Sequence, residues 1–280
     1  MSAALNLIAQ GPGVSAAAAQ ELAAMVQAGA TERLGELAYR LKKIKLTPSI
    51  ESWCEARRID HAWIAQRQRL ADVKLLAMDM DSTLITIECI DELGDLAGKK
   101  AEVAEITAQA MRGEIEYPES LRRRVGLLAG LKEAELQRVY QQRLKLTPGA
   151  DVLLAACKKH GVKLLLVSGG FAFFTERLKE RLGFDYTVSN TLEIVHGRLT
   201  GKLVGPIVDA DAKAAKFVSV LKELHATKEQ GVAVGDGAND LKMMAEAGIS
   251  IAFHAKPVVR AQATFALNWS GLDGVVNLFE

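Results

Sequence analysis

Two aspartates, Asp79 and Asp81, directly follow the apolar run at residues 73–78 and stand two positions apart. An aspartate carboxylate can attack phosphorus and form an aspartyl phosphate that water later breaks. A second carboxyl group, protonated when substrate arrives, can donate to the leaving oxygen and then activate water. The pair therefore suits one phosphoryl group held between a nucleophile and an acid/base.

A third carboxylate, Asp236, lies in the segment Gly-Asp-Gly-Ala-Asn-Asp at residues 235–240, which follows the apolar run 231–234. If the fold brings Asp79, Asp81 and Asp236 together, their charges repel unless a cation joins them. Oxygen ligands with room for water and phosphate suit Mg²⁺. These residues predict a magnesium site.

Groups that can hold an anion follow another apolar run, residues 162–167, which ends in Ser168, Gly169 and Gly170. A hydroxyl and glycine amides at a helix start can cradle a phosphate. Lys213, at the expected N-terminus of another helix, can add a positive charge. The phosphate and the metal are therefore expected in one site.

Each of these signals is weak when taken alone. Asp-x-Asp pairs are common in caps and turns, Ser-Gly-Gly is usually a turn, and a single lysine is most often a solvated helix charge. The segment 235–240 could be a loop or a cation site without catalysis. All four occur in order, each after an apolar run or at a helix start, which favours the functional interpretation.

An alternation of strands and helices must position these groups. Apolar strands are predicted at 75–78, 162–167 and 231–234, helices at 150–160 and 212–225, and a hairpin at 192–199 with His196-Gly197 in its turn. This alternation predicts an α/β fold with a parallel sheet and helices on both faces. Ligands of such sheets bind at the carboxyl ends of the strands, where the motifs lie.

Residues 1–72 read as a separate small α+β module, followed by a catalytic domain at 73–280. Strands are expected near 4–9 and 61–65, Ser15 as a helix N-cap, helix near 48–58, and a mixed strand or helix pattern at 34–44. The polar run 66–69 reads as a linker. We expect a chain starting near Ala71 to fold and to retain catalysis. The module could bury its apolar residues against the core or pair with a second copy, which makes a homodimer a possible assembly.

Composition limits the partners. The 280 residues carry a net charge of +1, which argues against nucleic acid or an anionic membrane as a bulk partner. No stretch approaches the ~20 apolar residues of a membrane span. Cys54, Cys89 and Cys157 are scattered and odd in number, and the N-terminal segment lacks the pattern of a secretory signal. A reducing cytoplasm is the expected compartment.

The ordered motifs Asp-Met-Asp-Ser-Thr, Ser-Gly-Gly, Lys213 and Gly-Asp-Gly-Ala-Asn-Asp resemble the haloacid dehalogenase superfamily of aspartate-nucleophile phosphatases. Residues 81–93 and 110–125 are similar to two motifs of its phosphoserine phosphatase family, and the resemblance covers about 73–265. It implies a Rossmann-like sheet with an inserted helical cap of the C1 type at about 86–146. It also implies Mg²⁺-dependent hydrolysis of the small molecule O-phospho-L-serine to L-serine and phosphate, the last step of serine biosynthesis. Residues 1–72 loosely resemble a shortened ACT unit.

The resemblance also implies residue roles. Asp79 is the nucleophile and a metal ligand, Asp81 is the acid/base and binds metal through its backbone carbonyl, and Asp236 is the third ligand. Ser168, Gly169 and Lys213 would bind the phosphate, Asn239 would line the substrate site, and Asp240 would support the metal ligands. Glu88 would bind the substrate ammonium group and Arg124 its carboxylate. A carboxylate with a guanidinium suits an α-amino acid.

One residue departs from the resemblance, because Tyr117 stands where the family usually has phenylalanine in the cap. Alternatives to the phosphoserine reading also remain open. A relative with the same core could act on another small phosphomonoester or pass the phosphoryl group to an acceptor such as homoserine. A non-catalytic phosphoserine or serine sensor has no need of Asp79 and Asp81. A sugar-nucleotide transferase with a metal-binding Asp-x-Asp has no role for Lys213.

Overall fold

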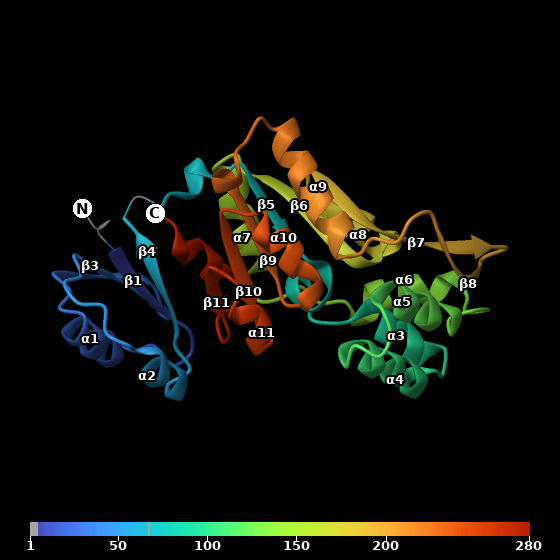
Figure 1. The fold of residues 1–280 in the computed structure, drawn as a ribbon, viewed down its shortest axis with the longest axis horizontal. Helices are drawn as coiled ribbons and strands as arrows, with labels where there is room; N and C mark the ends of the chain where they lie inside the picture. Colours follow the sequence, from blue (N-terminus) through green and yellow to red (C-terminus); the bar gives the residue numbers. More distant parts are fainter. Residues whose placement is uncertain (1–4, 67) are drawn as a thin grey trace.

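The computed structural model describes residues 5–66 and 68–280 and shows three parts in a row (Figure 1). A small sheet lies at one end, an α/β core in the middle and a group of helices at the other end. Residues 1–4 and Arg67 lie outside the described residues. The predicted start of the first strand at residue 4 and one residue of the predicted linker fall there. No helix in the described part is long and apolar enough to cross a membrane.

The core contains a seven-stranded sheet in the order β11-β10-β9-β5-β6-β7-β8. All pairs are parallel except β7 with β8, and the strands are β5 Leu75–Met78, β6 Lys163–Phe171, β7 Tyr186–Val195, β8 Arg198–Val204, β9 Gly231–Gly235, β10 Ile249–Phe253 and β11 Phe265–Leu267. Central strand β5 pairs with β6 and β9, so the carboxyl ends of all three meet at one edge. The predicted α/β class is confirmed.

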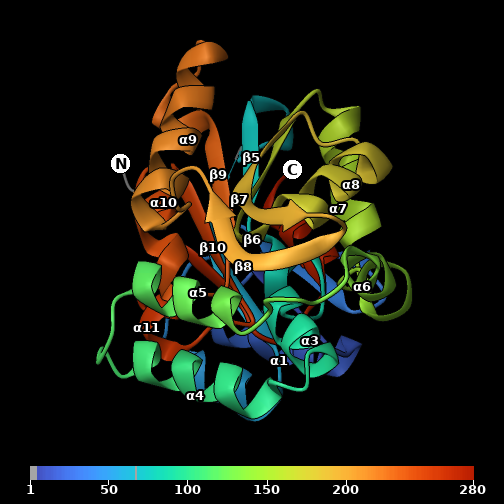
Figure 2. The same ribbon diagram turned by 90° about the vertical axis from the view of Figure 1, so that its right-hand side faces the viewer.

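Helices cover both faces of this sheet, as Figure 2 shows. Leu76 and Met78 face the side that α7 and α8 cover, while Leu75 and Ala77 face α9, α10 and α11. Apolar residues therefore occupy successive positions of β5, the pattern of a strand buried on both sides. The covering helices are α7 Ala150–Lys159, α8 Ala172–Leu182, α9 Ala210–Glu223, α10 Leu241–Ala245 and α11 Pro257–Arg260.

Four helices between β5 and β6 form the cap: α3 Cys89–Leu96, α4 Lys100–Met111, α5 Tyr117–Gly126 and α6 Glu133–Arg138. The chain enters and leaves the cap side by side, because Ile85 pairs with Leu146 in an antiparallel bridge. The assignment of the cap to residues 86–146 stays a prediction.

The predicted hairpin is present and longer than expected, since residues 191–195 of β7 pair with residues 198–204 of β8. His196 and Gly197 have φ of 51° and 71°, the positive values that a two-residue type I′ turn requires. The hairpin also contacts the cap, where Gly130 N donates to Leu199 O at 2.8 Å and Leu199 N donates to Leu131 O at 2.9 Å. The core thus supports the cap through these hydrogen bonds in addition to the two chain crossings.

The N-terminal part has the element order βαββαβ, with β1 Leu5–Gln10, α1 Ala16–Met25, β2 Ala30–Gly35, β3 Ala38–Lys42, α2 Glu51–Ala56 and β4 Asp60–Ala65. Its antiparallel sheet runs β2-β3-β1-β4, the ferredoxin-like order. Ser15 caps α1 by accepting from Ala18 N, as predicted. The ambiguous segment 34–44 contains the end of β2, a turn at 36–37 and the whole of β3. The relation to ACT units and the domain boundary at 72/73 stay predictions.

Buried hydrogen bonds join the small sheet to the C-terminal segment, which was not expected. The Asp60 carboxylate accepts from the backbone N–H groups of Asn268, Trp269 and Ser270 at 2.7, 3.1 and 2.8 Å. Gln68 Nε2 donates to Leu278 O at 2.8 Å. Gln68 of the predicted linker therefore contacts the C-terminal segment, and a chain beginning near Ala71 would lose this contact and those of Asp60. The linker stays a prediction.

Replacing Asp60 by alanine should destabilise the protein by about 3 kcal/mol, because buried backbone N–H groups then lose their shared acceptor. Asp60 itself is only 1% exposed, so water cannot readily replace it. Urea unfolding of wild type and variant measures the change. Asp72→Ala is the control, because it removes an exposed carboxylate paired with Arg69 and should barely move the midpoint. Equal midpoints for wild type and Asp60→Ala would contradict the docking role.

Candidate active site

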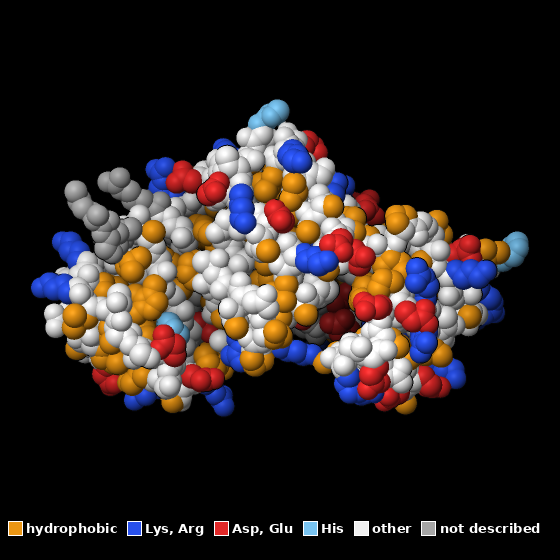
Figure 3. All heavy atoms as spheres, viewed as in Figure 1, with side chains coloured by type: hydrophobic (Ala, Val, Ile, Leu, Met, Phe, Trp, Pro, Cys, Tyr) orange, Lys and Arg blue, Asp and Glu red, His pale blue; other side chains and the backbone are white. Residues whose placement is uncertain are grey.

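A pocket of about 130 Å³ lies between the carboxyl ends of the core strands and the cap. Figure 3 shows acidic side chains in the hollow between these two parts. The pocket is lined by Asp79, Asp81, Glu88, Ile90, Tyr117, Leu121, Arg124, Gly169, Gly170, Phe171, Asp236 and Asn239. Ser168 and Lys213 are buried beside it. The structure therefore gathers every residue to which the sequence assigned a role.

A larger cavity, about 560 Å³, lies elsewhere, between the small sheet and the core. Its walls include Trp63 and Trp269, and its buried carboxylate is that of Asp60. Both oxygens of Asp60 already accept backbone hydrogen bonds, so this acid serves the docking of the two parts. The smaller cavity is lined by several carboxylates and is the better candidate for chemistry.

The loop after β5 presents both aspartates of the first motif. Asp79 ends the strand, and Ser82 has a φ of 57°, so the chain turns sharply through the left-handed region. Thr83 Oγ1 donates to Asp236 Oδ1 at 3.0 Å, which ties this loop to the one after β9. Ser82 Oγ donates to Glu88 Oε1 at 2.6 Å. The tight turn thus connects the segment after β5 to both the loop after β9 and the cap.

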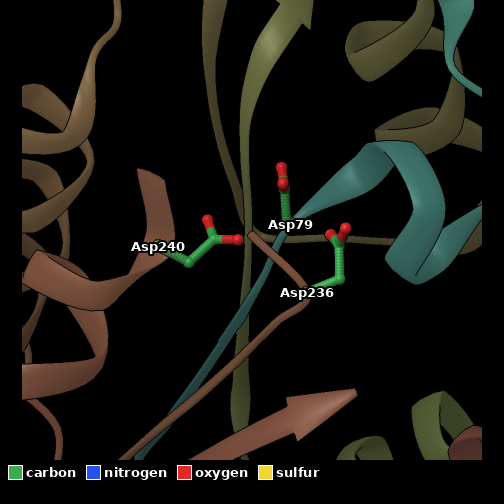
Figure 4. Close-up of side chains that lie close together, drawn as sticks. All are labelled: Asp79, Asp236 and Asp240. Carbon is green, nitrogen blue, oxygen red and sulfur yellow. The ribbon is translucent and has the colours of Figure 1, made fainter. Parts of the chain in front are cut away.

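Three carboxylates form a cluster suited to a cation. Oxygens of Asp79, Asp236 and Asp240 lie within 4.8 Å of one another, and Figure 4 shows Asp79 approaching from the end of β5 and the other two from the segment after β9. Burial and then the nearby charge of Asp240 raise the pKa of Asp79 well above its usual range. The same two causes raise the pKa of Asp236 to about 6. Acids held this close in a buried place fit a bound metal ion, whose charge would offset their repulsion.

This cluster differs in one member from the expected set, since it contains the side chain of Asp240 and not that of Asp81. Asp240 is fully buried, and its Oδ1 accepts from Lys213 Nζ at 2.8 Å. Its Oδ2 accepts from Gly237 N at 3.2 Å. The expected contact from Asp81 is through its backbone carbonyl, so the side-chain cluster leaves that assignment a prediction.

The Asp81 side chain is placed for proton transfer. Its Oδ1 accepts from Cys89 N at 3.0 Å, and its Oδ2 lies 3.5 Å from Ser168 Oγ. Burial raises the pKa of Asp81 to about 6. The acid form therefore persists closer to neutral pH than it does for an ordinary aspartate, which favours a proton donor.

Lys213 lies fully buried in the first turn of α9. Asp209 caps that helix by accepting from Ala212 N at 2.9 Å. Lys213 Nζ is 3.0 Å from Asp79 Oδ1 and 2.8 Å from Asp240 Oδ1. Burial alone would lower the pKa of the ammonium, but the two carboxylates more than offset this and hold it above its usual range. The ammonium stays charged beside the expected nucleophile.

Ser168, Gly169 and Gly170 lie in the last part of β6, where its pairing with β7 shifts between Val167 and Phe171. Gly170 N donates to Ser168 Oγ at 2.8 Å. A Cβ on Gly170 would lie 2.5 Å from Asp81 Oδ2, and one on Gly169 would overlap the Tyr117 hydroxyl. Backbone and side chains approach one another closely here, so only glycine fits at these two positions.

The cap contributes one negative and one positive group. Glu88 stands at the start of α3, where burial and then the charge of Asp81 raise its pKa to about 7, while Arg124 acts in the opposite direction. Arg124 projects from α5 and lines the same pocket. Apolar Ile90 and Leu121 complete this part of the wall. The arrangement can hold a small molecule with both charges, such as an α-amino acid.

Sequence reasoning missed Asn190, which is buried in β7. Its Nδ2 donates to Gly169 O at 2.8 Å, and its Oδ1 accepts from Val208 N at 2.8 Å. No local pattern distinguishes this asparagine from its neighbours, so the sequence offered no signal. Thr83 was also assigned no role, although it belongs to the first motif.

Comparisons with known proteins agree with this geometry. The family profile of haloacid dehalogenase-like hydrolases matches residues 76–245. A phosphoserine phosphatase of Polaromonas sp. strain JS666 is 55% identical over 215 residues, 75% of this chain and 91% of that protein. The unliganded crystal structure of a probable phosphoserine phosphatase from Vibrio cholerae superimposes with a TM-score of 0.85 at 39% identity, covering 99% of this chain and 86% of that one. A phosphoserine phosphatase solved as a phospho-aspartyl intermediate analogue gives 0.70 at 36% identity, covering 74% and 99%.

Proposed function

This chain belongs to the haloacid dehalogenase-like hydrolases, and from that membership we propose that it hydrolyses O-phospho-L-serine to L-serine and phosphate. The observation that carries the proposal is a single pocket whose wall contains the carboxylates of Asp79, Asp81 and Asp236 together with the oppositely charged pair Glu88 and Arg124. The similarity to phosphoserine phosphatases over most of the chain supports the same substrate. In this role the enzyme would complete serine biosynthesis.

We assign the nucleophile to Asp79. Its Oδ1 accepts from Met80 N at 2.8 Å and contacts Lys213, which leaves Oδ2 to attack phosphorus. Attack forms the O–P bond of an aspartyl phosphate and breaks the bond from phosphorus to the serine oxygen. The Lys213 ammonium and the Ser168–Gly170 segment would hold the phosphoryl oxygens as negative charge shifts toward the leaving group.

We assign the acid/base to Asp81. Its carboxyl group, with a pKa of about 6, would give its proton to the departing serine oxygen. The resulting carboxylate would then accept a proton from the water that attacks the aspartyl phosphate. Each cycle returns Asp81 to its protonated state and releases inorganic phosphate.

We propose that Asp79, Asp236 and the backbone carbonyl of Asp81 would hold Mg²⁺, with Asp240 supporting the site. The cluster of buried carboxylates is the observation that favours a cation here. When bound, the ion would neutralise charge on the phosphoryl oxygens. Asp240 also accepts from Lys213, so it would set the position of the ammonium relative to the nucleophile.

Glu88 and Arg124 should select the substrate rather than perform the chemistry. Arg124→Ala should lower kcat/KM for phosphoserine by an amount that corresponds to roughly 2–4 kcal/mol of activation free energy, because the substrate carboxylate loses its desolvated partner. Turnover of p-nitrophenyl phosphate, which lacks the amino-acid group, should fall much less. Arg123→Ala is a matched control on the same helix, since Arg123 pairs with Glu119 at the surface.

A panel of phosphomonoesters, measured with wild type and Arg124→Ala, tests the proposed substrate. Phosphoserine should have the highest kcat/KM with the wild type, and that preference should shrink in the variant. Equal losses on phosphoserine and p-nitrophenyl phosphate would assign Arg124 to the phosphate or the fold. A wild type that prefers another phosphomonoester would contradict the proposed substrate.

We further propose that the enzyme acts in the cytoplasm, where its three free, buried cysteines would remain reduced. We also propose a homodimer formed through the N-terminal part. Strand β2 lies at the edge of the small sheet and is almost entirely exposed, so it offers unpaired backbone groups to a second copy. Sedimentation velocity of the full chain measures this assembly, and a monomer at micromolar concentration would contradict it.

A further inference from the structure

The peptide between Gly169 and Gly170 is held from two parts of the molecule. Its carbonyl oxygen, on Gly169, accepts from the Tyr117 hydroxyl at 3.1 Å and from Asn190 Nδ2 at 2.8 Å. A carbonyl oxygen has two lone pairs, and these donors can use both. Tyr117 begins cap helix α5, whereas Asn190 belongs to core strand β7. Cap and core therefore share one acceptor in the last part of β6.

The orientation of this peptide affects the groups that face the phosphoryl site. A peptide unit is planar, so fixing the Gly169 carbonyl also fixes the N–H of Gly170. That N–H donates to Ser168 Oγ at 2.8 Å, and Ser168 Oγ lies 3.5 Å from Asp81 Oδ2. Glycines on both sides of the peptide allow many backbone conformations. Hydrogen bonds to the carbonyl must therefore do much of the work of holding it.

Only one of the two bonds depends on the cap. The core fixes Asn190 independently, because its side chain is buried and its Oδ1 accepts from Val208 N at 2.8 Å. Tyr117 reaches across from the cap, and its ring forms part of the pocket wall. Its hydroxyl can contact Gly169 only while α5 lies over the ends of the core strands.

We propose that Tyr117 is a positioning residue whose hydroxyl latches the closed cap to the Gly169 carbonyl. The latch keeps the Gly169–Gly170 peptide in the orientation that receives the phosphoryl group. A phenylalanine at this position would keep the ring in the wall and lose the latch. The inference rests on the proposed function only for the natural substrate, because the latch acts on the phosphoryl end of any phosphomonoester.

Tyr117→Phe tests the latch with the smallest possible change. We expect kcat/KM to fall about fivefold on phosphoserine and by the same factor on p-nitrophenyl phosphate, the loss that one hydrogen bond typically brings. The Tm should stay close to that of the wild type, because the ring still fills its place. Tyr186→Phe is the matched control. It also removes a tyrosine hydrogen bond, to Glu223 Oε1 at 2.7 Å on the exposed surface, and should leave both rates unchanged.

Several results would overturn the latch. Wild-type kcat/KM for Tyr117→Phe on both substrates would show that the hydroxyl positions nothing. A loss confined to phosphoserine would place the hydroxyl on the amino-acid part of the substrate. A large fall in Tm together with lost activity would assign the bond to stability. A wild type that hydrolyses p-nitrophenyl phosphate but not phosphoserine would instead contradict the proposed substrate, and the comparison on p-nitrophenyl phosphate would still test the latch.

Discussion

Asp79→Asn should abolish phosphate release from phosphoserine, with kcat lowered by ~10⁴-fold or more. An amide oxygen is a poor nucleophile, so the covalent step is lost while the side chain keeps its size. The buried ammonium of Lys213 keeps its other partner, Asp240, at 2.8 Å. The fold should therefore survive, and the loss should appear in the chemical step.

Rapid acid quenching with labelled substrate measures the covalent intermediate directly. With the label on the phosphoryl group, the wild-type protein should become covalently labelled during turnover, and the Asp79→Asn protein should not. Asp151→Asn is a control that makes the same chemical change at an exposed position on α7 and should leave both readings unchanged. Phosphate release by Asp79→Asn at a substantial fraction of the wild-type rate would refute the aspartyl-phosphate mechanism.

Removing the metal site should have the next largest effect. Asp236→Ala should lower activity by about 100-fold or more and weaken Mg²⁺ binding in parallel, because one expected ligand is lost. Excess Mg²⁺ should restore part of the activity, since the other carboxylates remain. EDTA should silence the wild type.

A second variant separates the metal role of Asp236 from its hydrogen bond. Asp236 Oδ1 accepts from Thr83 Oγ1 at 3.0 Å, so Asp236→Ala also removes this contact between two loops. Thr83→Val breaks the same contact and keeps the carboxylate. It should therefore lose much less activity and should need no extra Mg²⁺. Full wild-type activity in EDTA, or equal losses in the two variants, would contradict the metal assignment.

The central part of the site was predictable from sequence because two simple rules combine. Apolar runs mark buried parallel strands, and ligands of such sheets bind at the carboxyl ends of the strands. Asp79, Ser168 and Asp236 each lie at or near such an end, so their convergence followed from the pattern. Glu88 and Arg124 had no such signal, because an isolated charge on a helix looks like any solvated residue. Only the family resemblance assigned them.

Contacts between distant segments were not predictable. Asp60 caps backbone groups 208–210 residues away in the chain, and backbone N–H groups leave no mark in a sequence. Asn190 likewise binds a carbonyl and an N–H rather than side chains. The same limit applies to residues 66–69, whose local polarity suggested a linker and gave no sign of the hydrogen bond from Gln68 to Leu278 O. Tyr117 was noticed as a departure, but its partner carbonyl could not be inferred.

The docking of the small sheet on the C-terminal segment imposes an order on biosynthesis. Ile8, Ala62 and Ile64 belong to the same buried cluster as Leu272 and Leu278. Because 208 residues separate Asp60 from Asn268, the ribosome releases the first surface long before its partner. At ~5–20 residues per second, the delay is roughly 10–40 s. During that interval the apolar face of the nascent sheet lacks this cover, and molecular chaperones have time to bind it before the chain can close on itself.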